Sequence, residues 1–323
     1  MKNRLGLGAL VLALTACGNN ASPDSSASSS AATGVAASAS ASPAALPVPT
    51  ASAAAPAPSA SVDTHGIPIG VPFPAAAIVK TLNPKGVAPY SGPTGTLKGT
   101  IHVAGDAPPS VPGLKIKSKC SEATATYGKL FRVGLEKTLA DVLVAVTGYE
   151  GIVPASSDTV KMTIHGCALA KRTIAVTYGQ RLELSNLDPL EAFMPYLDGA
   201  PTESILVAVP GGPPVKLYPQ QPGHYLIRDQ LPNPFFTADV FVLAYSTHDV
   251  TGLDGQYEIK NVPVGQVKVN AFLPALSRKP AEEKAFEIKA GENKLDFTIK
   301  FDLKADVPGA AAGSASPATP PKK

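Results

Sequence analysis

Short apolar runs separated by glycine and proline most constrain what this 323-residue chain can fold into. In Gly95–Val103, residues Leu97, Ile101 and Val103 share one parity, as in a strand with one buried face. Leu139–Thr147 is apolar almost throughout, which is typical of a central strand. Because such runs recur without a convincing long helix, the sequence predicts an all-β fold of the β-sandwich class.

Further strands are predicted over Val160–Ile164, Thr173–Thr177, Arg181–Leu184, Tyr225–Ile227, Asp239–Tyr245, Tyr257–Ile259, Gln266–Phe272, Lys284–Ile288 and Lys294–Phe301. Only Lys129–Lys137 could contain a helical turn, and Gly134 lies inside it.

Composition separates the folding part of the chain from the rest. Of the 40 residues from Ala21 to Ala60, 33 are Ala, Ser or Pro, and only Asp24 is charged. Such a segment cannot bury enough side chain to offset the entropy of ordering it. We therefore predict a disordered tether over residues 17–64, an irregular lead-in over 65–94, a β-sandwich domain over 95–303 and a disordered tail over 304–323.

The first 16 residues have the pattern of a signal peptide. Lys2 and Arg4 precede the apolar run Leu5–Leu14, which is about half the length of a bilayer-spanning helix. The following Leu14-Thr15-Ala16-Cys17 resembles the lipobox of bacterial lipoproteins. This resemblance implies cleavage before Cys17 and a stable membrane anchor through its acyl chains. Gly18, by analogy with Gram-negative lipoproteins, favours the outer membrane; an ordinary cleaved signal with a free cysteine is the alternative.

The charge balance excludes a strongly basic nucleic-acid binder. The chain has 28 Lys and Arg against 25 Asp and Glu, and removing Lys2 and Arg4 with the signal leaves 26 against 25. A nearly neutral surface gives no electrostatic case for a nucleic-acid partner.

Two cysteines remain once Cys17 carries lipid. Cys120 and Cys167 belong to an exported chain, and in an oxidising compartment a disulfide is the default. Closing a loop of about 48 residues would stabilise the fold by about 4 kcal/mol. A metal-thiolate pair is the alternative, but no clustered histidine supports it.

Two segments resemble carboxypeptidase regulatory-like (transthyretin-like) domains. Thr251–Val269 has their strand, turn, strand pattern, with a tight turn at Asp254-Gly255, and Gly95–Pro108 is similar to their first strand and turn. The resemblance implies a rigid, non-catalytic sandwich.

Cys167–Asp239 resembles the cupredoxin-like half of exported bacterial proteins related to methylamine-utilisation proteins. The cysteine pair, the Asn186-Leu187-Asp188-Pro189 turn and Leu231–Pro234 carry this resemblance. In the copper-binding members, histidines follow the turn, and a cysteine and a histidine precede the next strand. A type 1 copper site needs two imidazoles and a thiolate. The corresponding positions here are Ala192, Phe193, Met194 and Pro195, then Gln230 and Asn233.

The remaining candidates for chemistry are weak. The histidines His65, His102, His165, His224 and His248 are widely separated, and we expect each at an exposed loop or strand edge. There is no G-x-S-x-G motif, and Thr202-Glu203-Ser204 is an ordinary polar loop. We expect the Asp188 and Glu191 carboxylates to face water rather than flank a sugar bond. Gly211-Gly212 precedes two prolines, which lack the amide donors of a phosphate cradle. Without tryptophan, a carbohydrate platform would need tyrosines such as Tyr196, Tyr218 or Tyr225.

The sequence thus predicts no catalytic, cofactor-binding or metal-binding residue, and a chain that is not an enzyme. Its predicted function is that of a cell-envelope lipoprotein, a binding or structural module whose partner is the membrane and an envelope protein or glycan. Two alternatives remain open at this point. One is a metal-carrying or electron-transfer cupredoxin relative, and the other is carbohydrate or peptidoglycan recognition through the loops at 188–200 and 220–234.

Overall fold

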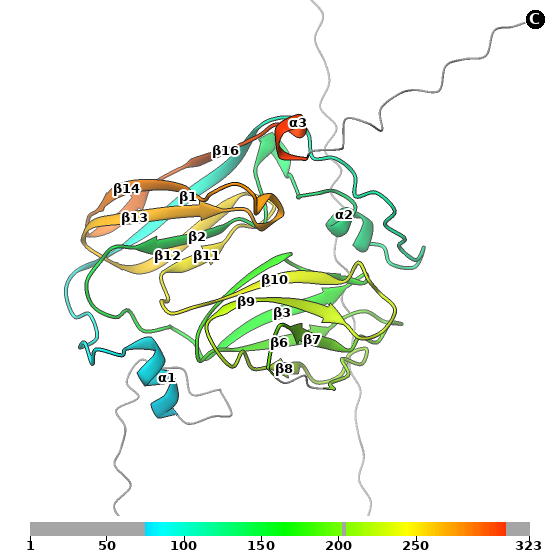
Figure 1. The fold of residues 1–323 in the computed structure, drawn as a ribbon, viewed down its shortest axis with the longest axis horizontal. Coiled ribbons are helices and arrows are strands. Elements are labelled where there is room, and N and C mark those ends of the chain that lie inside the picture. The colour runs from blue at the N-terminus through cyan, green and yellow to red at the C-terminus, as the bar shows by residue number, and fades with distance from the viewer. Residues whose placement is uncertain (1–74, 202–204, 308–323) are drawn as a thin grey trace, which may run out of the picture. The chain divides into compact units, whose positions relative to one another are not determined.

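The computed structural model of the chain describes residues 75–201 and 205–307 (Figure 1). The predicted signal peptide (1–16), Cys17, the tether (17–64), residues 65–74 of the lead-in and residues 308–323 of the tail lie outside the described residues. Within the described part, no helix is long and apolar enough to cross a bilayer.

The first sandwich consists of two four-stranded sheets and occupies the upper half of Figure 1. One sheet has the order β12-β1-β15, with β16 also paired to β1, and the other has the order β11-β2-β13-β14. The strands are β1 (Thr94–Gly105), β2 (Leu143–Thr147), β11 (His248–Val250), β12 (Gln256–Pro263), β13 (Gly265–Phe272), β14 (Glu282–Ile288), β15 (Gly291–Lys294) and β16 (Phe297–Phe301).

The second sandwich, in the lower half of Figure 1, pairs sheets of order β5-β10-β9-β7 and β4-β3-β6-β8. Its strands are β3 (Thr159–His165), β4 (Ala168–Leu169), β5 (Thr173–Thr177), β6 (Arg181–Asn186), β7 (Pro195–Asp198), β8 (Val215–Leu217), β9 (Gly223–Asp229) and β10 (Thr237–Leu243). All of them lie between β2 and β11 in the sequence, so the second sandwich is inserted into the first. The predicted all-β sandwich class is confirmed, and this insertion interleaves the two modules.

β1 shows how sequence pattern becomes sheet position. Its buried positions alternate with partly exposed ones, and Leu97, Ile101 and Val103 point into the core as their shared parity predicts. β1 pairs first with β15 and then with β16, because Leu295 and Asp296 bulge out between them. Gly99 faces this bulge so closely that a Cβ there would collide with the Leu295 carbonyl. The predicted strand Lys294–Phe301 is therefore two strands.

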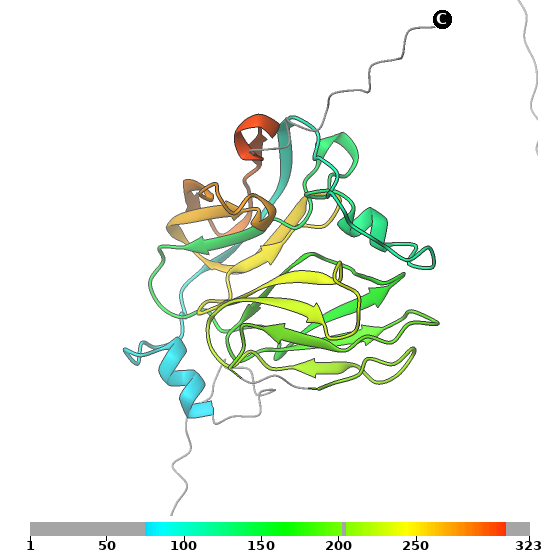
Figure 2. The ribbon, with the colours of Figure 1, turned by 45° about the vertical axis from the view of Figure 1, so that its right-hand side comes forward.

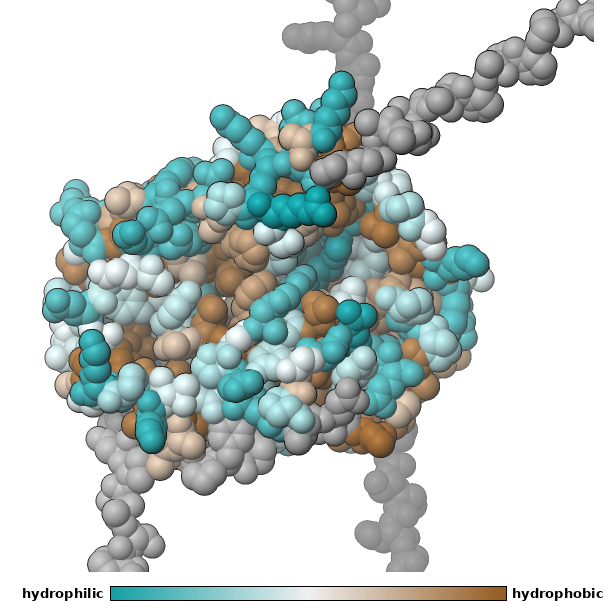
Figure 3. Space-filling model, viewed as in Figure 1, coloured by the Kyte–Doolittle hydropathy of each residue, from teal (hydrophilic) through white to brown (hydrophobic). Residues whose placement is uncertain are grey.

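Edge strands of the first sandwich are protected by charge. β14 pairs only with β13 among the described residues, and its outer part carries Glu282, Glu283 and Lys284, all exposed. Figure 3 shows hydrophilic side chains over β13 and β14 at its upper left. Charged side chains on an edge oppose pairing with the edge of another molecule.

Each sandwich has its own hydrophobic core. Leu97, Val144 and Phe297 are among the buried side chains of the first core, and Ile164, Phe193 and Val240 among those of the second. A third cluster of Leu143, Ala175 and Val250 lies where the two sandwiches meet. The continuous apolar pattern of β2 is explained by this arrangement, because β2 faces the first core on one side and the second sandwich on the other.

Short helices complete the fold. α1 (Ala75–Leu82) buries Ile78 in the second core, although the sequence predicts an irregular lead-in here. The prolines that suggest irregular structure all precede Ala75, and the run of eight residues after them has none before Leu82. The remaining helical segments are α2 (Ala123–Tyr127), the 3-10 turns η1 (Leu135–Lys137) and η2 (Pro274–Leu276), and α3 (Leu303–Asp306). η1 lies within the segment predicted to contain a helical turn.

A buried ion pair joins the two sandwiches. Arg132 donates from Nε and Nη2 to the two carboxylate oxygens of Asp141, each at 2.6 Å, and the side chains are 9% and 6% exposed. The same carboxylate accepts from the backbone N–H of Arg172 at 2.8 Å, and the Asp141 N–H donates to the carbonyl of Thr251 at 3.1 Å. Asp141 therefore ties the entry of β2, the entry of β5 and the end of β11 together.

Replacing Asp141 should cost much of the stability of the fold. In Asp141→Asn the new amide presents N–H groups to a buried guanidinium, and we expect a loss of about 3–5 kcal/mol in the free energy of unfolding, measured by urea denaturation. Asp198→Asn is the control, because the Asp198–Arg228 pair is 44% and 48% exposed. The control should lose less than about 1 kcal/mol, and equal losses in the two variants would contradict the prediction.

Candidate functional site

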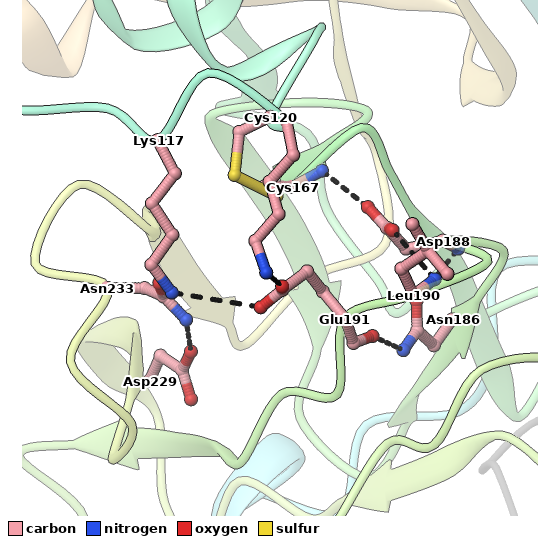
Figure 4. Close-up of a disulfide and its surroundings, with 10 residues drawn as sticks. Lys117, Cys120, Cys167, Asn186, Asp188, Leu190, Glu191, Asp229 and Asn233 are labelled. Carbon is pink, nitrogen blue, oxygen red and sulfur yellow. Dashed lines mark hydrogen bonds and ion pairs between the residues drawn. A yellow bond between two sulfur atoms is a disulfide. The ribbon is translucent and has the colours of Figure 1, made fainter.

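The loops at one end of the second sandwich hold the positions that the cupredoxin resemblance singles out. The turn after β6 contains Asn186 and Asp188, and the segment after β9 contains Asn233. Figure 4 shows these side chains beside the disulfide between Cys120 and Cys167. The structure thus brings the predicted residues together at one place.

Asn186 and Asp188 hold the turn through side-chain hydrogen bonds. The Asn186 amide donates to the carbonyls of Glu191 at 2.7 Å and Ala208 at 2.8 Å, and its Oδ1 accepts from the Asp188 N–H at 2.9 Å. The Asp188 carboxylate accepts from the N–H of Cys167 at 2.8 Å. Asp188 is buried, so the prediction that it faces water is wrong. The Asn-x-Asp pattern was the available signal, because Asn side chains cap their own turns in this way.

Asp229 organises the opposite side of the same end, although no sequence pattern singles it out. Its Oδ1 accepts from the N–H groups of Met194 at 2.8 Å and Leu231 at 3.1 Å. Its Oδ2 accepts from the side-chain amide of Asn233 at 2.7 Å. Asn233 is buried and Met194 partly buried, so the two positions contribute to loop structure.

Two phenylalanines fill the interior between these loops. Phe193 and Phe236 stack with their ring centroids 4.8 Å apart at an interplanar angle of 22°. Both side chains are almost fully buried, and Phe193 also pairs with Ala208 through two backbone hydrogen bonds. Where the copper-binding relatives are expected to carry a histidine, this chain has a core side chain.

The disulfide fastens the segment before α2 over this end. Cys120 and Cys167 are both buried, and the bond joins the turn after Lys117 to the turn between β3 and β4. Glu191, whose side chain is 14% exposed, forms ion pairs with Lys119 and with Lys117. Glu191 is therefore occupied by two cations, contrary to the expectation that it faces open water.

The carboxylates at this end serve as acceptors for backbone and side-chain donors. Among the described residues, no buried side-chain nitrogen or oxygen lacks a hydrogen-bond partner. In the same part of the chain, no three His, Cys, Asp or Glu side chains are grouped so that they could hold a metal ion. The arrangement fits a structural closure of the sandwich.

The histidines are dispersed over the described part of the chain. His165 and His224 are exposed as predicted, and His224 stacks on Phe241 at 4.6 Å while pairing with Asp239. His248 differs, because it lies in β11 between the two sandwiches and its Nε2 is 3.1 Å from Thr177 Oγ1. Burial lowers the pKa of His248 to about 4, so the expected exposed position is wrong for this residue. His65 lies outside the described residues.

The predicted tyrosine platform is not assembled. Tyr225 is buried, and its hydroxyl donates to the carbonyl of Gln221 at 2.9 Å, while Tyr196 and Tyr218 are partly buried. The loop of Thr202-Glu203-Ser204 lies outside the described residues.

Sequence reasoning missed a polar groove on the first sandwich. A hollow of about 630 Å³ lies over β1, β12 and β15 and is lined by residues that include Lys98, Glu258 and Glu292. Lys98 Nζ lies 2.5 Å from Glu292 and 3.4 Å from Glu258, and the hydrogen bond to Glu292 raises the pKa of Lys98. The charges of this groove neutralise one another.

No family model matches this chain, and no curated protein is similar enough in sequence to match it. Among solved structures, a copper-containing nitrite reductase (NirK) from Thermus scotoductus SA-01 is similar at 14% identity and a TM-score of 0.24, covering 30% of this chain and 24% of that one. A heme-copper terminal oxidase dimer is similar at 9% identity and a TM-score of 0.23, covering 30% of this chain and 72% of that one. At these TM-scores the likeness carries no argument about fold or function.

Breaking the disulfide should weaken the fold. Cys120→Ser together with Cys167→Ser should lower the free energy of unfolding by about 4 kcal/mol in urea denaturation, because the closed loop of about 48 residues restricts the unfolded chain. In the Cys17→Ser background, thiol titration of the unfolded, unreduced protein should find no free thiol. Two reactive thiols would contradict the bond.

His248 should make stability depend on pH. Its pKa is about 4 in the folded protein and about 6.5 in the unfolded chain, so the unfolded state binds more protons between these values. Stability should therefore fall as the pH drops from about 6.5 to about 4, by up to about 3 kcal/mol, and this contribution should level off below pH 4. His248→Gln should flatten this part of the urea-denaturation profile, whereas His165→Gln, at an exposed position, should leave it unchanged. Parallel profiles for wild type and His248→Gln would refute the assignment.

Proposed function

We propose that this chain is a non-catalytic cell-envelope lipoprotein whose two β-sandwiches act as a binding or structural module. The supporting observation is the loop end of the second sandwich, where Phe193 and Phe236 stack and Asp188 and Asp229 accept hydrogen bonds from their own loops. A site that bound a metal or performed catalysis at this end would need these side chains for other purposes.

The lipid anchor is the second part of the proposal. The lipobox-like sequence before Cys17 and the Ala, Ser and Pro-rich residues that follow it support a sandwich held to a membrane by a long tether. The second residue, Gly18, supports the outer membrane as the destination. The membrane is therefore the first partner, and an envelope protein or glycan is the second.

The disulfide agrees with this location. Cys120 and Cys167 are bonded in the structure, and disulfides persist in exported proteins and are rare in the cytosol. The resemblance to carboxypeptidase regulatory-like domains, carried by the Asp254-Gly255 turn before β12, supports a rigid, non-catalytic first sandwich.

Cys17→Ser separates the anchor from the module. Wild-type protein should sediment with membranes after cell lysis, and the variant should be released to the soluble fraction, because it lacks the acylated thiol. Elemental analysis of the purified, soluble variant should find no stoichiometric copper or zinc. Stoichiometric metal would overturn the proposal in favour of a metal-carrying or electron-transfer protein, and release of wild type with the variant would overturn the anchor.

A further inference from the structure

The segment Ile205–Val209 exposes aliphatic side chains where an ordinary extended segment exposes polar ones. Its residues alternate, with Leu206 partly buried against the second core and Ala208 buried in it. The outward residues Ile205, Val207 and Val209 are 78%, 49% and 44% exposed. A segment with one face on a core and one face in water normally carries polar residues on the second face. Here both faces are apolar.

Two leucines from the neighbouring turn extend this exposed surface. Leu187 and Leu190 are 56% and 78% exposed. They flank the residues that the turn bonds to the segment, because Asn186 donates to the Ala208 carbonyl and accepts from the Gly211 N–H. We call Leu187, Leu190, Ile205, Val207 and Val209 the aliphatic face. Contiguous exposed aliphatic side chains on a soluble domain mark a contact with a partner or a membrane.

Cations border the aliphatic face. Lys117 and Lys119 both form ion pairs with Glu191, the residue that follows Leu190. Lys115, two residues before Lys117, is also exposed. Three cations against one carboxylate leave this border positive, which complements an anionic lipid surface.

We propose that the aliphatic face is a membrane-contact surface that inserts into a phospholipid bilayer bearing anionic headgroups. The inference rests on the proposed envelope location, and it names the partner of the second sandwich. Leu190 and Ile205 project from loops, and projecting aliphatic side chains are buried readily by fluid hydrocarbon, whereas a protein partner would need a matched pocket for each. The lysine border then lies at headgroup level, where long basic side chains reach phosphate while their stems stay in apolar surroundings.

Vesicle binding by the full chain without its anchor tests the proposal. The Cys17→Ser protein should cosediment with vesicles of phosphatidylethanolamine and phosphatidylglycerol, and less with phosphatidylcholine alone. Adding Leu190→Gln and Ile205→Thr should reduce the bound fraction by about tenfold or more, since two buried aliphatic side chains are lost. Adding Val207→Thr and Val209→Thr instead changes shape little and should also weaken binding.

The matched control uses exposed leucines of the first sandwich. Leu135 and Leu253 are 88% and 52% exposed, so Leu135→Gln with Leu253→Gln removes comparable apolar surface elsewhere while keeping the same tether. This control should bind vesicles as the Cys17→Ser protein does, and all variants should share its urea midpoint.

Two results would overturn the membrane-contact surface. One is no vesicle binding by the Cys17→Ser protein, which would leave the exposed aliphatic residues to a protein partner. The other is equal binding by the control and both aliphatic-face variants. Neither result bears on the lipid anchor, because Cys17 is absent from every protein in this test.

Discussion

The carboxylate of Asp141 lies at the point where the chain passes between its two sandwiches. Four groups from three segments meet there: the guanidinium of Arg132, the N–H of Arg172 and the backbone of Thr251 around Asp141 itself. A buried carboxylate is tolerated only when its oxygens are paired, so these segments must come together for the fold to be stable. The insertion of the second sandwich between β2 and β11 depends on this joint, because both of its connections pass close to it.

The loop end of the second sandwich uses polar chemistry for structure. Asp188 and Asp229 each accept from backbone N–H groups, and the interior between their loops is filled by Phe193 and Phe236. The disulfide and the lysine pairs of Glu191 then hold the segment before α2 against the same end. Closing one part of this end leaves aliphatic side chains projecting from the adjoining loops, and the proposed membrane contact uses that surface.

Strand positions followed from sequence wherever one face of a strand meets a core. β5 was predicted at its observed bounds, and the alternation in β1 was correct, because burial on one side imposes a period of two. The short strands β7 and β8 escaped prediction, since three or four residues are too few to show a period. His248 and Asp188 were placed in solvent because each looks like a loop or edge residue locally, and their burial comes from segments far away in the chain.

The sequence by itself determined the class of fold, the signal and lipobox pattern, and the absence of copper ligands at the cupredoxin-like positions, because each is written in local residue types and spacings. Only the tertiary structure decided which charges are buried and which apolar side chains are left uncovered. Asp141 needs partners from residues 132, 172 and 251, and the aliphatic face draws on two separate loops. Burial depends on what packs from elsewhere in the chain, so neither could be predicted before the two sandwiches were placed together.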